Sequence, residues 1–121
     1  MRKYLLGAKG KFYKANLHVH TTISDGALTP EQAKEAYKKQ GYSILAYTDH
    51  EILVPHNDLT DEGFLAITSY EAHINERIDN SAFPFIRTYH LNFYAKDKDA
   101  MISPCFNVGA IWLEHSLDYV T

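Results

Sequence analysis

KANLHVHTTISDGALTPEQAKEAYKKQGYSILAYTDH, residues 14–50, contains the pattern that decides the fold. Residues 14–19 predict a first strand, residues 28–41 predict a helix, and residues 42–50 predict a second strand. A strand, a helix and a strand in close succession are typical of a right-handed parallel crossover. We therefore expect an α/β fold built on a parallel sheet.

Both ends of the expected helix carry sequence signals. Thr29 is placed to cap the N-terminus, Pro30 occupies the first helical position, and Gln32 can complete a capping box. Gly41 suits the left-handed position that follows many helices. An apolar stripe at helical spacing is expected to pack on the sheet, and it consists of Ala33, Ala36 and Tyr37.

Beyond residue 50 the sequence predicts two more strands, so that four mostly parallel strands are expected in all. The segments in order are a loop (51–63), a strand that ends near Glu71 (64–74), a turn region (75–84), a strand (85–95) and a short helix (108–120).

The composition is that of an ordinary globular chain. Its 121 residues, 45% of them hydrophobic and 22% charged, suit a single domain spanning residues 1–121. A net charge of −3 gives no basic footprint for nucleic acid, and no apolar run approaches the roughly 20 residues of a membrane span. Cys105 is the lone cysteine, so an intramolecular disulfide is excluded, and we expect a cytoplasmic protein.

Histidine and carboxylate side chains gather where the predicted strands end. His18 and His20 are two residues apart on the first strand and therefore point to the same face. The second strand ends at His50 and the third near Glu71, and strand ends of this kind share one edge of a parallel sheet. His90 lies inside the fourth strand instead. Imidazole and carboxylate ligands suit Zn, Mn or Fe, and Glu71 is the natural bridge between two ions.

Each of these residues alone also has a structural interpretation. A pair of strand histidines can face solvent, His50 can bond to a backbone group, and Glu71 can be an ordinary exposed carboxylate. Their order along a strand–helix–strand frame is what favours a metal site. Of the other histidines, we expect His56 to be exposed in its loop and His115 to lie on a helix surface. His73 can share the face of Glu71, as a further ligand or a substrate contact.

Four segments resemble the successive motifs of the PHP family, named for polymerase and histidinol phosphatase. They are NLHVHTTISDGALTPEQ (16–32), ILAYTDH (44–50), ITSYEAHIN (67–75) and YHLNFYA (89–95). The resemblance implies a distorted TIM-like barrel of about seven strand–helix units. It also implies up to three divalent ions at the strand C-terminal ends. The implied activity is hydrolysis of a small phosphorylated substrate by a metal-bound hydroxide.

The resemblance also implies how the ligands would be shared. Three ion sites follow from it: one held by His18, His20 and Glu71, one held by Glu71 and His90, and one held by Asp25 and His50. Asp49 matches a position that orients a ligand or a loop.

The chain departs from the family after the fourth motif. Family members continue with a later histidine and an acidic-x-His pair, and neither follows before Thr121. We therefore expect about the first half of the barrel, which would self-associate or be completed by a missing C-terminal half. Two functions stay open, a metal-dependent phosphoesterase and a non-catalytic metal-binding module. Neither the substrate nor the metal follows from the sequence.

Overall fold

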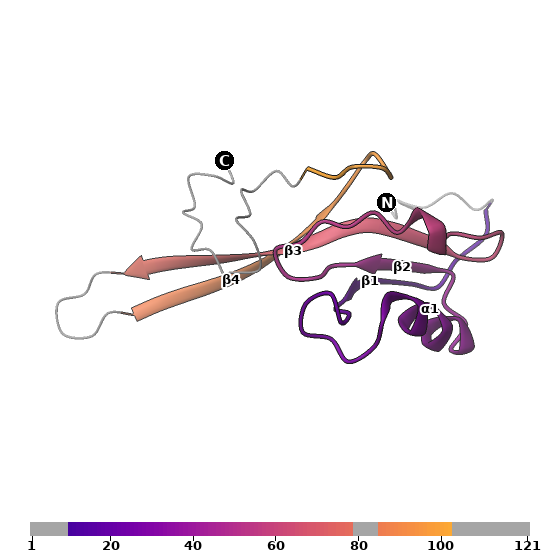
Figure 1. Ribbon diagram of the computed structural model, residues 1–121, viewed down its shortest axis with the longest axis horizontal. Helices are drawn as coiled ribbons and strands as arrows, with labels where there is room; N and C mark the ends of the chain where they lie inside the picture. Colours follow the sequence, from indigo (N-terminus) through magenta and orange to yellow (C-terminus); the bar gives the residue numbers. More distant parts are fainter. Residues whose placement is uncertain (1–9, 79–84, 103–121) are drawn as a thin grey trace, which may run out of the picture.

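The computed structural model describes residues 10–78 and 85–102 and shows an α/β arrangement (Figure 1). The elements in chain order are β1 (Ala15–Val19), α1 (Pro30–Lys39), β2 (Ile44–Tyr47), the 3-10 turn η1 (Asn57–Leu59), β3 (Leu65–Ile78) and β4 (Phe85–Tyr94). The predicted strand–helix–strand start is therefore confirmed. The predicted helix at 108–120, Cys105 and His115 lie outside the described residues. No helix within those described ranges is long and apolar enough to cross a membrane.

The four strands form one sheet in the order β1-β2-β3-β4. β1 is parallel to β2 and β2 is parallel to β3, with Ile44 opposite Leu65 and Tyr47 opposite Thr68. β4 is antiparallel to β3. The expectation of mostly parallel strands is confirmed for the first three strands, and the antiparallel β4 makes the sheet mixed.

Helix α1 begins and ends where its sequence signals predict. The Thr29 hydroxyl accepts a hydrogen bond from the Gln32 N–H (3.2 Å), and the Gln32 side chain accepts one from the Thr29 N–H (3.0 Å). Gly41 follows the C-cap with a φ of 80°, which is the left-handed conformation. Ala33 is buried, but Ala36 is exposed, so the stripe that packs on the sheet is narrower than predicted.

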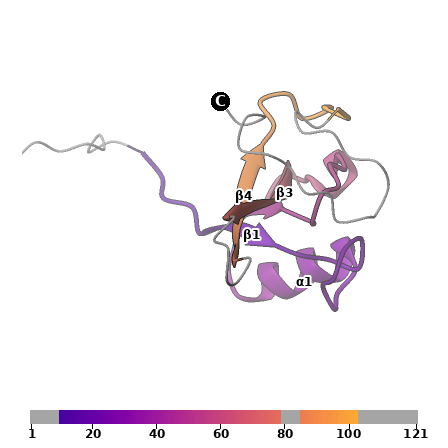
Figure 2. The same cartoon turned by 90° about the vertical axis from the view of Figure 1, so that its left-hand side faces the viewer.

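The main core lies between α1 and the sheet. α1 covers one side of the sheet and the segment 95–102 lies on the other (Figures 1 and 2). The buried apolar side chains of this core are Ala33, Leu45, Tyr47, Leu59, Phe64 and Ala66. A smaller cluster joins Tyr70 and Ala72 to Leu53 and Phe93, and the rings of Tyr70 and Phe93 stack with centroids 5.2 Å apart.

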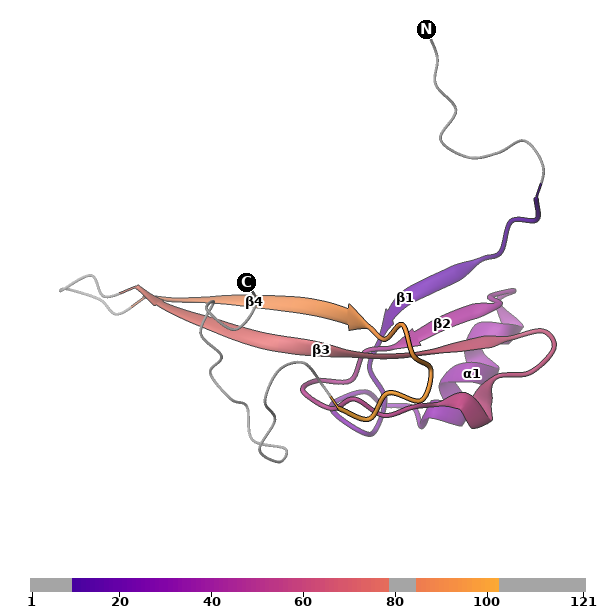
Figure 3. The same cartoon turned by 90° about the horizontal axis from the view of Figure 1, so that it is seen from above.

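β3 is longer than the sequence predicts. The prediction of a strand ending near Glu71 and a turn region from residue 75 is wrong for residues 75–78, because β3 continues to Ile78; the rest of that turn region, residues 79–84, lies outside the described residues. Every residue from Ser69 to Ile78 faces a partner in β4, and the last pair joins Ile78 to Phe85. The resulting two-stranded ribbon projects beyond the rest of the sheet (Figures 1 and 3). Cross-strand hydrogen bonds therefore override the turn-like composition of this polar stretch.

The sheet curls, so that its two outer strands approach one another. The Tyr94 hydroxyl at the end of β4 donates a hydrogen bond to the Leu17 carbonyl of β1 (2.8 Å), although β2 and β3 lie between them. In a flat sheet these strands would be three spacings of about 4.8 Å apart. No strand of the described residues closes the sheet into a ring. This curled, open sheet is consistent with part of a barrel.

Candidate metal centre

The candidate ligands gather around one carboxylate, that of Glu71, and Asp25 joins them through His20 and His50. They come from β1, β3, β4 and the segments that follow β1 and β2: His18, His20, Asp25, His50, Glu71 and His90. Three imidazole nitrogens surround Glu71 Oε2, namely His20 Nε2 at 3.2 Å, His50 Nδ1 at 3.1 Å and His90 Nδ1 at 3.3 Å. His18 Nε2 lies 3.7 Å from Oε1. The fold therefore brings the whole predicted set together.

The backbone places His50 beside Glu71 although β2 has already ended. The Glu71 N–H donates to the Asp49 carbonyl (3.1 Å) and the Glu51 N–H donates to the Glu71 carbonyl (2.8 Å). Parallel pairing thus continues as an isolated bridge at His50. Glu51 has a φ of 58°, which is uncommon for a residue other than glycine, and its buried carboxylate accepts a hydrogen bond from the His73 N–H. These contacts hold the chain against β3 directly after His50.

The ligand atoms form three overlapping groups. Within each group the atoms all lie within 4.8 Å of one another: His18, His20 and Glu71; His20, Asp25 and His50; and His50, Glu71 and His90. The first group equals one set that the family resemblance implies. Each of the other two groups contains one implied pair and one further histidine. His20 is added to the pair of Asp25 and His50, and His50 is added to the pair of Glu71 and His90. Each group offers three donors, which is the number that leaves one position open in a catalytic zinc site.

The buried polar atoms of this cluster lack hydrogen bonds to one another and are spaced like the ligands of a cation. The Glu71 side chain is 4% exposed, and Oε2 makes no hydrogen bond to any described residue although three imidazole nitrogens surround it. His20 Nε2 makes none either within the described part of the chain. Ligand atoms about 2.1 Å from a tetrahedral ion are about 3.4 Å apart, close to the spacing of these contacts. Because an uncompensated buried carboxylate is costly, the donor set suits divalent cations.

Thr48 orients the ring of His18. Its hydroxyl donates to the Val19 carbonyl (3.2 Å), accepts from the Val19 N–H (3.1 Å), and lies 2.8 Å from His18 Nδ1. This contact holds the ring with Nδ1 towards Thr48 and Nε2 towards Glu71, the orientation in which Nε2 can serve a metal ion.

Asp49 anchors the loop that follows β1. Its buried carboxylate accepts hydrogen bonds from the Thr21 N–H (2.7 Å), the Thr21 hydroxyl (2.9 Å) and the Ser24 hydroxyl (2.7 Å). Gly26 is packed so closely against the backbone of His20 that a Cβ atom there would overlap it. The loop is therefore held from both ends.

Two groups of the cluster have shifted pKa values. The hydrogen bond with His20 Nδ1 (2.7 Å) lowers the pKa of Asp25, and it outweighs the opposing effect of burial. Burial lowers the pKa of His50, and the nearby His20 lowers it further. Asp25 is therefore an anion and His50 a neutral imidazole at neutral pH, and these are the forms that bind metal ions.

Two other histidines, His56 and His73, lie outside the three ligand groups. The prediction that His56 is exposed is wrong, because the turn η1 folds this loop back and buries the ring against Tyr47, with centroids 4.6 Å apart. His73 reaches His90 with a distance of 2.9 Å between its Nδ1 and His90 Nε2, and it belongs to none of the three groups.

The sequence interpretation missed most of the residues that hold the ligands in place. These are Thr21, Ser24, Thr48 and Glu51. Thr48 could have been found, because it precedes Asp49 and a strand-end histidine and carries a hydroxyl in reach of neighbouring strands. Nothing distinguished the two loop hydroxyls from ordinary turn residues, since their partner lies 25 or more positions away.

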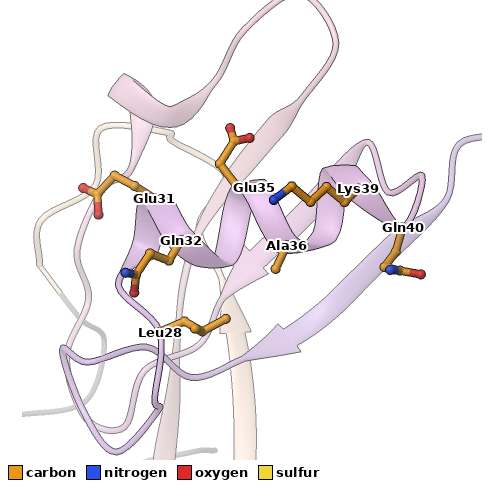
Figure 4. Close-up of a pocket in the computed structure, with 7 residues that line it drawn as sticks. All are labelled: Leu28, Glu31, Gln32, Glu35, Ala36, Lys39 and Gln40. Atoms are coloured by element: carbon orange, nitrogen blue, oxygen red, sulfur yellow. The ribbon is translucent and has the colours of Figure 1, made fainter.

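A separate hollow of about 500 Å³ lies along α1 (Figure 4). It is lined by Leu28, Glu31, Gln32, Glu35, Ala36, Lys39 and Gln40. It shares no residue with the histidine cluster. Its charged side chains are spaced four residues apart along one helix and do not converge as ligands do.

Comparisons with known proteins agree with this geometry. The sequence model of the PHP domain matches residues 16–110. The chain is also similar to the DNA polymerase/3'-5' exonuclease PolX of Bacillus subtilis (strain 168), with 46% identity over 50 residues. This match covers 40% of the chain and 9% of that protein, so the chain spans only a small part of its relative.

Proposed function

The chain belongs to the PHP domain family, and from this premise we propose that it is a metal-dependent phosphoesterase acting on a small phosphorylated substrate. The single observation that supports this most is the Glu71 carboxylate, buried and surrounded by three imidazole nitrogens within 3.3 Å. Divalent cations in such a site supply Lewis acidity towards phosphoryl oxygens and make water a better nucleophile.

The residues divide into ligands and residues that orient ligands. We assign His18, His20, Asp25, His50, Glu71 and His90 to the first class, with Glu71 shared between neighbouring ions. Thr48 and Asp49 belong to the second class, since each holds a ligand or its loop without joining a group. The chain's own contribution is then to place donors in fixed positions and in their ion-binding protonation states.

The cluster is open to solvent on one side. The side chains of His18, Asp25 and His90 are 48%, 56% and 42% exposed, whereas those of Glu71 and His50 are 4% and 8% exposed. A phosphate ester can therefore approach from the exposed rim while the shared carboxylate stays shielded. The relative from B. subtilis is named a 3'-5' exonuclease, so a single-stranded oligonucleotide is a second probe beside small phosphate esters.

The test measures bound metal and hydrolysis together. We expect the protein reconstituted with Mn²⁺, Zn²⁺ or Fe²⁺ to hydrolyse an aryl phosphate, and EDTA to abolish the reaction. Glu71→Gln should lower the rate more than about 100-fold, because removing a ligand costs more than removing a residue that orients one. Glu62→Gln, an exposed carboxylate outside the cluster, is the matched control and should not change the rate.

Metal content measured by mass spectrometry separates the possible failures. His18→Ala combined with His20→Ala should reduce the number of bound ions. Hydrolysis that resists EDTA would contradict a metal-dependent reaction. Stoichiometric binding of ions with no hydrolysis of any probe would instead favour the non-catalytic metal-binding module.

A further inference from the structure

His73 is a histidine beside the cluster to which the proposed function gives no role. It lies directly opposite His90 in the antiparallel pairing of β3 with β4, so both side chains are on the face that carries Glu71. Directly opposite side chains in such a pair are close neighbours. The two rings have centroids 4.9 Å apart, and His73 Nδ1 lies 2.9 Å from His90 Nε2.

We propose that His73 is a positioning residue that holds His90 with its Nδ1 lone pair directed at the Glu71 carboxylate. The inference rests on the proposed function, because it concerns a ligand of the same site. His73 would act only through His90 and would touch neither the ions nor the substrate.

The hydrogen-bond inventory of the two rings supports this assignment. A neutral imidazole has one N–H donor and one acceptor nitrogen, so a contact of 2.9 Å between two rings needs one proton between them. If His73 Nδ1 carried that proton, His90 would be protonated on Nδ1 and would direct this N–H at Glu71 Oε2, 3.3 Å away. No hydrogen bond from a described residue satisfies Oε2. We therefore assign the proton to His90 Nε2, the arrangement that leaves the lone pair of His90 Nδ1 available to a cation beside Oε2.

The surroundings of the two rings show which one holds the other. The His90 side chain is 42% exposed and stands on an outer strand, where it retains rotamer freedom. His73 stands on the inner strand β3, and its backbone N–H is bonded to the buried carboxylate of Glu51. The less exposed ring, on the inner strand, thus limits the rotation and the tautomer of the more exposed one, as residues behind metal-ligating histidines generally do.

Two substitutions separate the hydrogen bond from mere packing. His73→Asn keeps an acceptor near the position of Nδ1, whereas His73→Leu removes it. Tyr89→Phe, next to His90 but on the opposite face of β4, is the control for general disturbance of the strand. The first readout is the tautomer of His90 in the metal-free protein, from ¹⁵N spectra of histidine-labelled protein at about pH 8, where an ordinary imidazole is neutral. The second readout is the affinity for Co²⁺, followed by its visible absorption.

We expect His90 to carry its proton on Nε2 in the wild type, in Tyr89→Phe and in His73→Asn, and to become a mixture of tautomers in His73→Leu. The Co²⁺ ion held by the group of His50, Glu71 and His90 should bind about 10–100-fold more weakly in His73→Leu, and within about threefold of wild type in His73→Asn. An unchanged His90 tautomer in His73→Leu would overturn the proposal, as would an equal loss of affinity in both His73 variants. A wild type that takes up no Co²⁺ would overturn the proposed function, and the tautomer spectra would still decide the role of His73.

Discussion

Replacing Asp49 should destabilise the whole fold and not only the loop that follows β1. Asp49 is 3% exposed, and its carboxylate accepts three hydrogen bonds, two from Thr21 and one from Ser24. Thr21 itself has 0% exposure, so water cannot replace the lost acceptor without opening the structure. In Asp49→Ala both donors of Thr21 remain buried without an acceptor.

The expected loss follows from these contacts. A hydrogen bond to a charged group contributes about 1.5–3 kcal/mol, and a buried donor left without a partner costs about 1–3 kcal/mol. Counting the two buried donors of Thr21, and allowing water to reach Ser24, Asp49→Ala should lower the free energy of unfolding by about 3–5 kcal/mol. Asp49→Asn keeps the volume and one acceptor oxygen but turns an NH₂ group towards a donor, so we expect a loss of about 1.5–3 kcal/mol.

Equilibrium unfolding in urea measures these losses. The matched control is Asp58→Asn, an exposed aspartate of η1, which should change the free energy of unfolding by no more than about 0.5 kcal/mol. If Asp49→Ala stayed within about 1 kcal/mol of that control, the three hydrogen bonds would not be the support that their geometry indicates.

Three further predictions concern the loop, a buried histidine and the sheet edge. Gly26→Ala should abolish metal binding, because the added Cβ atom would overlap the His20 backbone. The control is Gly41→Ala, where φ is 80° but the space around the glycine is open, and it should lower the free energy of unfolding by only about 1 kcal/mol. Burial lowers the pKa of His56 below its ordinary 6.5, so the unfolded chain binds more protons between the two values. This contribution to stability should be complete above about pH 6.5 and be lost as the pH drops through the folded-state pKa. In urea unfolding at a series of pH values, His56→Phe should therefore show a smaller pH dependence than the wild type, and the part that comes from His50 should remain. Leu17 is 48% exposed on the outer strand β1, and no described strand covers that edge of the sheet. We therefore expect the protein to self-associate as its concentration rises, and Leu17→Lys to weaken this association. A monomer at every concentration in sedimentation velocity would refute the prediction.

Features set by neighbouring residues could be predicted from the sequence. The ends of α1 follow from Thr29, Gln32 and Gly41, whose partners lie within the same few residues. The side-by-side placement of His18 and His20 follows from the period of a strand. In each case the structure is fixed by residues only a few positions apart, so a short stretch of sequence is enough to predict it.

Features set by distant partners could not be predicted. The extension of β3 to Ile78 depends on β4, and the burial of His56 depends on how η1 folds onto Tyr47. The sequence places His90 inside its strand, whereas the ligands of a parallel sheet gather at the strand ends. In the antiparallel pairing it stands opposite His73, two residues along β3 from Glu71, and this register brings it to the cluster.

The position of the ligands links ion binding to the stability of the sheet. His18 belongs to β1, His50 follows β2, Glu71 belongs to β3 and His90 to β4, so ions held by this set would connect all four strands. In the unfolded chain only His18, His20 and Asp25 are near one another in sequence, and the affinity for an ion should be low. A ligand that binds only the folded state adds about 2.7 kcal/mol at a free concentration 100 times its Kd. EDTA should therefore lower the urea midpoint of the metal-loaded wild type, and it should have a much smaller effect on Glu71→Gln, which lacks the carboxylate shared between the groups. Equal effects on both proteins would show that the ions bind elsewhere, because Glu71 belongs to two of the three groups in this sheet.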